Sequence, residues 1–265
     1  MAYKAGCNYI IRVLVFFLAA LCAVIGLSAC ATIPPVRKPP SYPTKEICPV
    51  LPGVVLRQDI YHTVGPGETL WRISKMYDVK IEEVIRANGL GKPEELKMGQ
   101  RLIIPQAAPL RPVIPLYRSD RWEYIIIHHS ATDQGDALSL NKIHLNRGFW
   151  KGLGYNFTID NGTCGKADGQ IEVSPRWIKQ EEGAHCRAFN MNHVGIGICL
   201  VGNFSIEKVS GAQMDSLVYL VDALREYYNI PLANIKGHGQ VPGAKTECPG
   251  IYFPWDEFRV RLKKN

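Results

Sequence analysis

Prolines gathered in two segments divide this 265-residue chain and limit what each part can fold into. They stand at positions 34, 35, 39, 40, 43, 49 and 52, and again at 105, 109, 112 and 115. Proline fixes φ and lacks an amide donor, so such segments favour extended polyproline II over helices or central strands. We therefore predict a proline-rich tether at 30–60, a small domain at 61–105, a proline-rich linker at 106–120 and a larger domain at 121–265.

The first 29 residues have the pattern of an export signal. Lys4 and Arg12 flank its start, and an uncharged apolar run follows at 13–27, shorter than the roughly 20 residues that a membrane span needs. The next letters, LSAC at 27–30, resemble a bacterial lipobox. That resemblance implies a signal peptide cleaved before Cys30, lipidation of Cys30, and a place in the bacterial cell envelope, anchored to a membrane and facing the periplasm or the wall. Ordinary cleavage at 29–31 and an uncleaved anchor are the alternatives.

The composition is that of a globular protein, with 46% hydrophobic and 21% charged residues. The net charge of +7 is spread along the chain, so no nucleic-acid partner is expected. After Cys30, five cysteines remain, at 48, 164, 186, 199 and 248. Thiols of exported proteins tend to pair, and an odd number leaves one that is reactive or held by a metal. A Cys164–Cys186 disulfide is one hypothesis.

The small domain has the pattern strand, helix, helix, strand. Apolar residues recur at helical spacing over 69–77 and 81–87, between strand patterns at 61–64 and 101–105, where the closing strand is expected to end. A domain of this size needs its large side chains inside, so Trp71 is expected in the core.

This small domain resembles a LysM domain over its whole length, through YHTVGPGETLWRISKMYDVKIEEVIRANGL followed by LKMGQRLIIP. The resemblance implies binding of glycans that contain N-acetylglucosamine. It places the binding groove between the loops at 67–69 and 88–90. Composition alone does not point to a glycan.

Strand and helix patterns alternate through the larger domain. Strands are predicted from WEYIIIH, YNFTID and VGIGICLVGN, and a helix over 138–147. A second helix begins with Ser210 and Gln213 at capping-box spacing and carries one apolar stripe, so it should lie on one face of a sheet. We predict an α/β fold with a mixed central β-sheet flanked by helices, preceded by the small βααβ domain.

Two adjacent histidines end the first strand of the larger domain. Side chains alternate along a strand, so only one of His128 and His129 can face a given site. The segment GHGQVPGAKTECPG supplies His238 and Cys248. Three protein ligands with one open position are typical of catalytic zinc, and a metal also accounts for the odd cysteine. Alternatively, Cys248 is a thiol nucleophile with His238 as its base, which leaves the strand histidine without a role.

The larger domain resembles the type 2 N-acetylmuramoyl-L-alanine amidases and the related peptidoglycan recognition proteins. The resemblance is carried by GLGYNFTID, EEGAHCRAFNMNHVGIGICLVGNF and TECPG, in that order. It implies a Zn2+ cofactor held by His128, His238 and Cys248, and it selects His128 over His129.

The same resemblance implies further site residues. Tyr155 and Thr246 correspond to catalytic positions. Lys245 is an alternative to Thr246, because the segment before the cysteine is about two residues longer than in the recognition proteins. Substrate-binding positions fall on three residues: His185, Trp150 and His144.

Together the resemblances imply a zinc-dependent peptidoglycan hydrolase. It would cleave the amide between N-acetylmuramic acid and the L-alanine of the stem peptide while the LysM domain holds the glycan. The alternative is a non-catalytic peptidoglycan recognition lipoprotein of the same fold. Cys248 favours the hydrolase, since members that only bind commonly lack this cysteine.

Overall fold

The structure is a computed structural model that describes residues 43–51, 53–93 and 96–264. The predicted signal peptide, the lipidation site at Cys30 and the first part of the tether lie outside these residues. None of the helices described is both long enough and apolar enough to cross a membrane.

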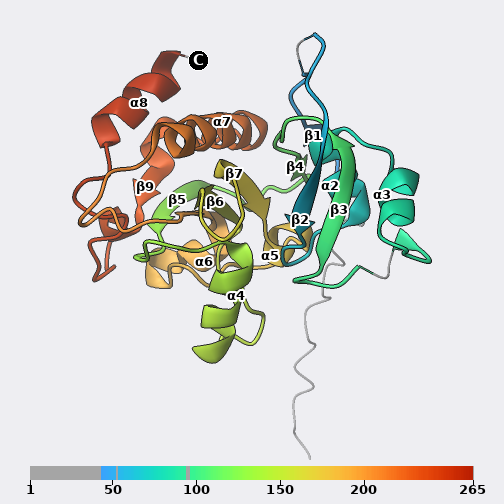
Figure 1. Cartoon of the computed structure of the whole chain (residues 1–265). Helices are drawn as coiled ribbons and strands as arrows, with labels where there is room; N and C mark the ends of the chain where they lie inside the picture. The colour runs from blue at the N-terminus through green and yellow to red at the C-terminus, as the bar shows by residue number, and fades with distance from the viewer. Residues whose placement is uncertain (1–42, 52, 94–95, 265) are drawn as a thin grey trace, which may run out of the picture. The chain divides into compact units, whose positions relative to one another are not determined.

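The small domain has the predicted order strand, helix, helix, strand (Figure 1). Its elements are β2 (Gln58–Thr63), α2 (Leu70–Tyr77), α3 (Ile81–Ala87) and β3 (Arg101–Ala107). Strands β2 and β3 pair antiparallel. The prediction that the closing strand ends at Pro105 is wrong, because β3 is an edge strand and edge strands tolerate proline.

Helix α2 shows how the sequence builds the small core. Thr69 caps it, because its side-chain oxygen accepts a backbone N–H of the first turn. The predicted stripe is buried, with Leu70, Ile73 and Tyr77 all inside. Trp71 is 41% exposed, so its predicted place in the core is wrong. The helical turn that buries its neighbours points position 71 toward solvent.

Part of the predicted tether and part of the predicted linker pair with one another. β1 (Lys45–Ile47) runs antiparallel to β4 (Ile114–Leu116), and the Thr44 N–H donates to the Leu116 carbonyl at 2.7 Å. The three residues of β4 are buried. For these residues the prediction of unpaired, extended chain is wrong. Pro115 is tolerated because a two-stranded sheet leaves one side of each strand without a partner.

A five-stranded mixed sheet is the centre of the larger domain, as predicted. Its strands are β5 (Tyr124–His129), β6 (Phe157–Asn161), β7 (Asp168–Val173), β8 (Gly195–Leu200) and β9 (Ile235–Gly237), in the order β7-β6-β8-β5-β9. β8 is parallel to both β5 and β6, β5 is parallel to β9, and β7 is antiparallel to β6. The α-helices of this domain are α4 (Ala137–Asn146), α5 (Pro175–Ile178), α6 (Met191–Val194), α7 (Gly211–Tyr228) and α8 (Trp255–Lys264).

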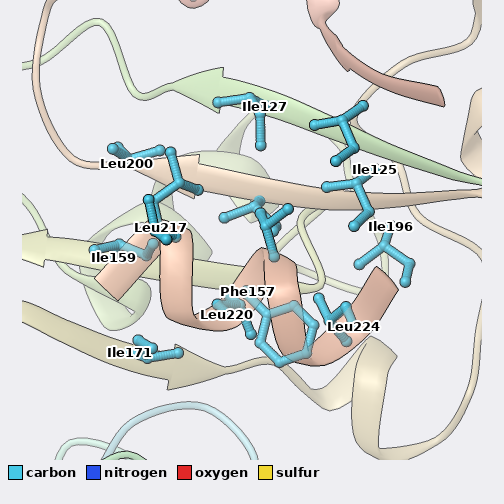
Figure 2. Packing of buried hydrophobic residues seen from close by; sticks show 14 of the residues in the cluster. Ile125, Ile127, Phe157, Ile159, Ile171, Ile196, Leu200, Leu217, Leu220 and Leu224 are labelled. Carbon is cyan, nitrogen blue, oxygen red and sulfur yellow. The ribbon is translucent and has the colours of Figure 1, made fainter. Parts of the chain in front are cut away.

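One face of this sheet is apolar and is covered by α7. Ser210 caps α7 by accepting the Gln213 N–H at 3.0 Å, in the predicted capping box. The predicted stripe at 214, 217, 218, 221 and 224 is buried. Figure 2 shows Leu217, Leu220 and Leu224 packed against isoleucines of the strands and Phe157. This packing supplies most of the core of the domain.

The opposite face of the sheet carries small and polar side chains. Alternation along the strands places His128, Cys199, Thr158 and Glu172 there. The register pairs His128 with Cys199, Cys199 with Thr158, and Thr158 with Glu172. A polar row therefore crosses four neighbouring strands and begins at the first of the two histidines.

Buried charges lie at the β7 end of this row. Lys166 Nζ is 2.8 Å from Glu172 Oε2 and donates to the Thr63 carbonyl of β2 at 3.1 Å. Glu68 pairs with Arg72 at 3.2 Å, and all four charged side chains are at most 4% exposed. Burying a charge is costly unless it is paired. Each of these four side chains is paired with one of opposite charge.

The five cysteines after Cys30 are free thiols in the described part of the chain. Cys164 is exposed and Cys186 is buried. The hypothesis of a Cys164–Cys186 disulfide is therefore wrong.

Candidate metal centre

Strand β5 directs its two histidines to opposite faces of the sheet, as alternation predicts. His129 lies on the side of Ile125 and Ile127, where its Nδ1 accepts the Phe204 N–H at 3.1 Å. His128 lies on the polar side and is 1% exposed. His129 is thus the structural member of the pair, and His128 is the one that can face a site.

The C-terminal loop brings His238 and Cys248 to His128. Strand β9 pairs with β5 and ends at Gly237, so His238 follows directly beside the end of β5. The candidate donor atoms of the three residues all lie within 4.8 Å of one another, and Cys248 Sγ is 3.7 Å from His128 Nδ1. Gly239 lets the loop double back, because a Cβ there would lie 2.4 Å from a carbonyl oxygen of the same loop.

The electrostatics of these three residues suit a cation. Burial lowers the pKa of His128 well below its ordinary value and also lowers the pKa of His238, so both imidazoles stay neutral. Burial raises the pKa of the Cys248 thiol to about 12. Two neutral nitrogens and one sulfur that needs a nearby positive charge to ionise form a donor set that fits a divalent metal ion of the zinc type.

Tyr155 lies beside this donor set. Its ring centroid is 5.2 Å from that of His128 and 5.3 Å from that of His144. Burial raises its pKa well above the ordinary value, so the hydroxyl keeps its proton at neutral pH. The preceding residue, Gly154, donates its N–H to His144 Nδ1 at 2.9 Å. His144 therefore holds the backbone that positions Tyr155.

His144 and Trp150, two of the predicted substrate-binding residues, differ in accessibility. His144 is 6% exposed, and burial together with nearby arginines lowers its pKa to about 4. Trp150 is 83% exposed, with Lys151 Nζ 4.6 Å from its ring centroid. Trp150 is accessible to a ligand, whereas His144 acts on the loop of Tyr155.

His185, the third predicted substrate-binding residue, is buried against His128. Its Nδ1 is 3.1 Å from His128 Nε2, and its Nε2 is 3.2 Å from the Gly195 carbonyl oxygen. Both ring nitrogens are thus engaged inside the protein. This arrangement was missed from the sequence. Its one local signal is the glycine pattern of β8, since a Cβ at Gly197 would lie 2.4 Å from the His185 ring.

Thr246 and Lys245, the alternatives for the second catalytic group, are both exposed on the loop before Cys248. Thr246 Oγ1 accepts the Cys248 N–H at 3.1 Å. This hydrogen bond fixes the Thr246 hydroxyl beside the backbone of a candidate ligand.

In the small domain, two side chains of the predicted glycan-binding loops have internal partners. The buried Glu68 carboxylate lies 2.8 Å from His62 Nε2. The Asn88 amide bonds both the N–H and the carbonyl of Ile103, each at 2.7 Å. Both side chains are therefore engaged inside the protein.

Comparison with protein families accounts for both domains. The LysM domain family matches residues 62–105, and the family of N-acetylmuramoyl-L-alanine amidases matches residues 118–251, about half of the chain. The chain belongs to the N-acetylmuramoyl-L-alanine amidase family. The family resemblances of the two domains are confirmed, and the matched part of this amidase-family chain contains His128, Tyr155, His238 and Cys248.

The relatives of this amidase-family chain include recognition proteins and endolysins. It is similar to Peptidoglycan-recognition protein 2 of Holotrichia diomphalia, with 34% identity over 102 residues, which cover 36% of this chain and 49% of that protein. The endolysin of Escherichia phage T7 is 30% identical over 135 residues, 48% of this chain and 80% of that protein. Among solved structures, N-acetylmuramoyl-L-alanine amidase LysC from Clostridium intestinale URNW is 34% identical, with a TM-score of 0.44 and coverage of 55% of this chain and 89% of that one.

Proposed function

We propose that the chain is a zinc-dependent amidase that cleaves the bond between N-acetylmuramic acid and the L-alanine of the peptidoglycan stem peptide. The observation that carries the proposal is the convergence of His128, His238 and Cys248 beside Tyr155. Family membership supports the reaction, and the donor chemistry supports the metal.

A zinc ion held by these three residues would supply Lewis-acid activation of water and of the scissile carbonyl. The chain prepares the site by keeping its imidazoles neutral. Their lowered pKa values mean that protons do not compete for the ring nitrogens near neutral pH. The Cys248 sulfur also accepts the His129 N–H at 3.4 Å, which favours its charged form.

Tyr155 would stabilise the negative charge that develops on the carbonyl oxygen of the substrate. Because its raised pKa keeps the hydroxyl protonated, it acts as a hydrogen-bond donor. A donor placed in this way is worth about 2.7 to 4 kcal/mol in the transition state. Thr246 is the proposed second donor, since its hydroxyl is fixed beside Cys248, and Lys245 is its alternative.

The remaining parts of the chain suit an enzyme of the cell envelope. We place it on a membrane through a lipid on Cys30, with the LysM domain bound to the glycan. The exposed ring of Trp150 offers a surface for the substrate beside the loop of Tyr155. Binding one part of a polymer raises the effective concentration of its other bonds at the site.

The test is digestion of purified sacculi by the full chain. We expect release of stem peptides with a free N-terminal alanine, detected by mass spectrometry. A chelator should stop the release, and added zinc should restore it. Cys248→Ser should abolish release, whereas Cys164→Ser, at an exposed thiol outside the centre, should not change it.

One result of this experiment would contradict the proposal. If the wild-type chain sediments with sacculi in the presence of a chelator and releases no stem peptide with zinc added, the protein recognises peptidoglycan without cleaving it, and the amidase proposal fails.

A further inference from the structure

Three polar groups form a line that starts at the candidate metal centre and leads into the protein. His128 Nε2 is 3.1 Å from His185 Nδ1. His185 Nε2 is 3.2 Å from the carbonyl oxygen of Gly195. On the other side of the first ring, His128 Nδ1 faces Cys248 Sγ at 3.7 Å.

The Gly195 carbonyl, at the end of this line, determines which ring nitrogens of His185 and His128 carry a hydrogen. A carbonyl oxygen can only accept, so His185 Nε2 carries the hydrogen. In a neutral imidazole the other nitrogen is an acceptor, so His185 Nδ1 accepts a hydrogen from His128 Nε2. His128 then has no proton on Nδ1. The free lone pair of His128 points toward Cys248, where a metal ion would be held.

We propose that His185 is a positioning residue, which accepts the Nε2 proton of His128 and so fixes its ring and presents its Nδ1 as a metal donor. The contact with the metal rests on the proposed function. The proton arrangement does not, because it follows from hydrogen bonds inside the protein.

The surroundings of His185 are built to hold this one orientation. Two glycines make room for the ring, since a Cβ at Gly183 or at Gly197 would lie 2.4 Å from its Cδ2. The adjoining backbone is also fixed, because Asn192 Oδ1 accepts the His185 N–H at 2.8 Å. The ring is buried between an imidazole and a backbone carbonyl, surroundings that favour its neutral form.

Partners of this kind orient metal-binding histidines, and their loss typically weakens metal affinity by about 10- to 100-fold. We would measure zinc affinity of the full chain by competition with a chromophoric chelator. His185→Leu should lower the affinity by that factor. His185→Gln keeps an acceptor and a donor and should restore most of it. The control, His193→Leu, removes an exposed histidine that pairs with Glu182, and should bind zinc as the wild type does.

A second variant covers the case in which His185→Leu does not fold. Gly197→Ala keeps the imidazole but displaces it, and it should also weaken zinc binding by at least about 10-fold. Wild-type affinity in a folded His185→Leu or Gly197→Ala chain would overturn the proposal.

The proton arrangement has its own readout, which needs neither zinc nor activity. In the metal-free wild type, imidazole nitrogen chemical shifts should show His128 protonated at Nε2 alone. A proton on Nδ1 instead would overturn the inference. If the wild type binds no zinc but His128 carries its proton on Nε2, the proposed function fails and the role of His185 in orienting His128 stands.

Discussion

Replacing Tyr155 by phenylalanine removes one hydroxyl and keeps the ring that packs between two imidazoles. The ring contacts, with centroids 5.2 Å from His128 and 5.3 Å from His144, do not involve the oxygen. The hydroxyl makes a hydrogen bond with the Cys199 side chain, so the cost to stability is that of one hydrogen bond, about 1 kcal/mol. The cost to catalysis is larger, because the hydroxyl is the proposed donor to the developing oxyanion. Loss of such a donor costs about 2.7 to 4 kcal/mol, which is a 100- to 1,000-fold slower turnover.

The assay is the initial rate of stem-peptide release from sacculi, measured with zinc content and the midpoint of urea unfolding. Tyr155→Phe should bind zinc fully and turn over 100- to 1,000-fold more slowly. Tyr219→Phe is the matched control, since Tyr219 is a half-buried tyrosine of α7 on the far face of the sheet. Undiminished turnover in Tyr155→Phe would remove the donor role. A loss of zinc would show that Tyr155 acts on the metal site itself.

Three further predictions concern the buried charges and the ligand loop. Burial alone would raise the pKa of Glu68, but its hydrogen bond and ion pair with His62, together with the charges of Arg72 and Lys166, lower it from 4.5 to about 2. About 3 kcal/mol of stability should therefore be present above pH 4.5 and disappear as the pH falls toward 2. Glu68→Gln should abolish this dependence in urea unfolding followed by tryptophan fluorescence. Lys166→Met leaves Glu172 buried without its cation and should cost about 3 to 5 kcal/mol of unfolding free energy. A loss under about 1 kcal/mol would mean that the Glu172 carboxyl is protonated instead. Thr246→Val should slow turnover about 100-fold at unchanged zinc content if Thr246 is the second donor, and an unchanged rate would assign that role elsewhere.

Local patterns were sufficient for elements whose contacts repeat along the sequence. The stripe of α7 and its Ser210 cap lie within one segment, so periodicity predicts them. The same is true of the alternation of side chains along β5, which placed His128 and His129 on opposite faces. The order of the small domain followed from two helical stripes between two strand patterns.

What the sequence did not predict depends on partners far along the chain. β9 has three residues and exists through its pairing with β5, and β7 is held by β6. The pairing of β1 with β4 joins segments whose prolines favour extended, unpaired chain. The place of one side chain outside the stripe of α2 was also misjudged, since Trp71 is large and apolar but lies on the outer side of its helix.

At the candidate metal centre, the spacing of histidines and cysteines along the sequence was not enough to identify the three ligands. Alternation left either strand histidine open, and the family resemblance chose His128. The place of His185 was missed because it depends on the space that Gly197 leaves on β8. That space is evident only once the fold brings β8 against the segment that carries His185.

The pairing of β1 with β4 also bears on how the protein would respond to tension. Lys45, at the start of β1, lies opposite Leu116, at the end of β4. A pull between the chain before residue 44 and the larger domain therefore acts on both strands at the same end, and it opens their hydrogen bonds one after another instead of all at once. Strand β1 is also tied directly to the LysM domain, because Lys75 Nζ of α2 lies 3.1 Å from Glu46 Oε1. Tension on the chain before residue 44 would therefore load the β1–β4 pair and helix α2 together.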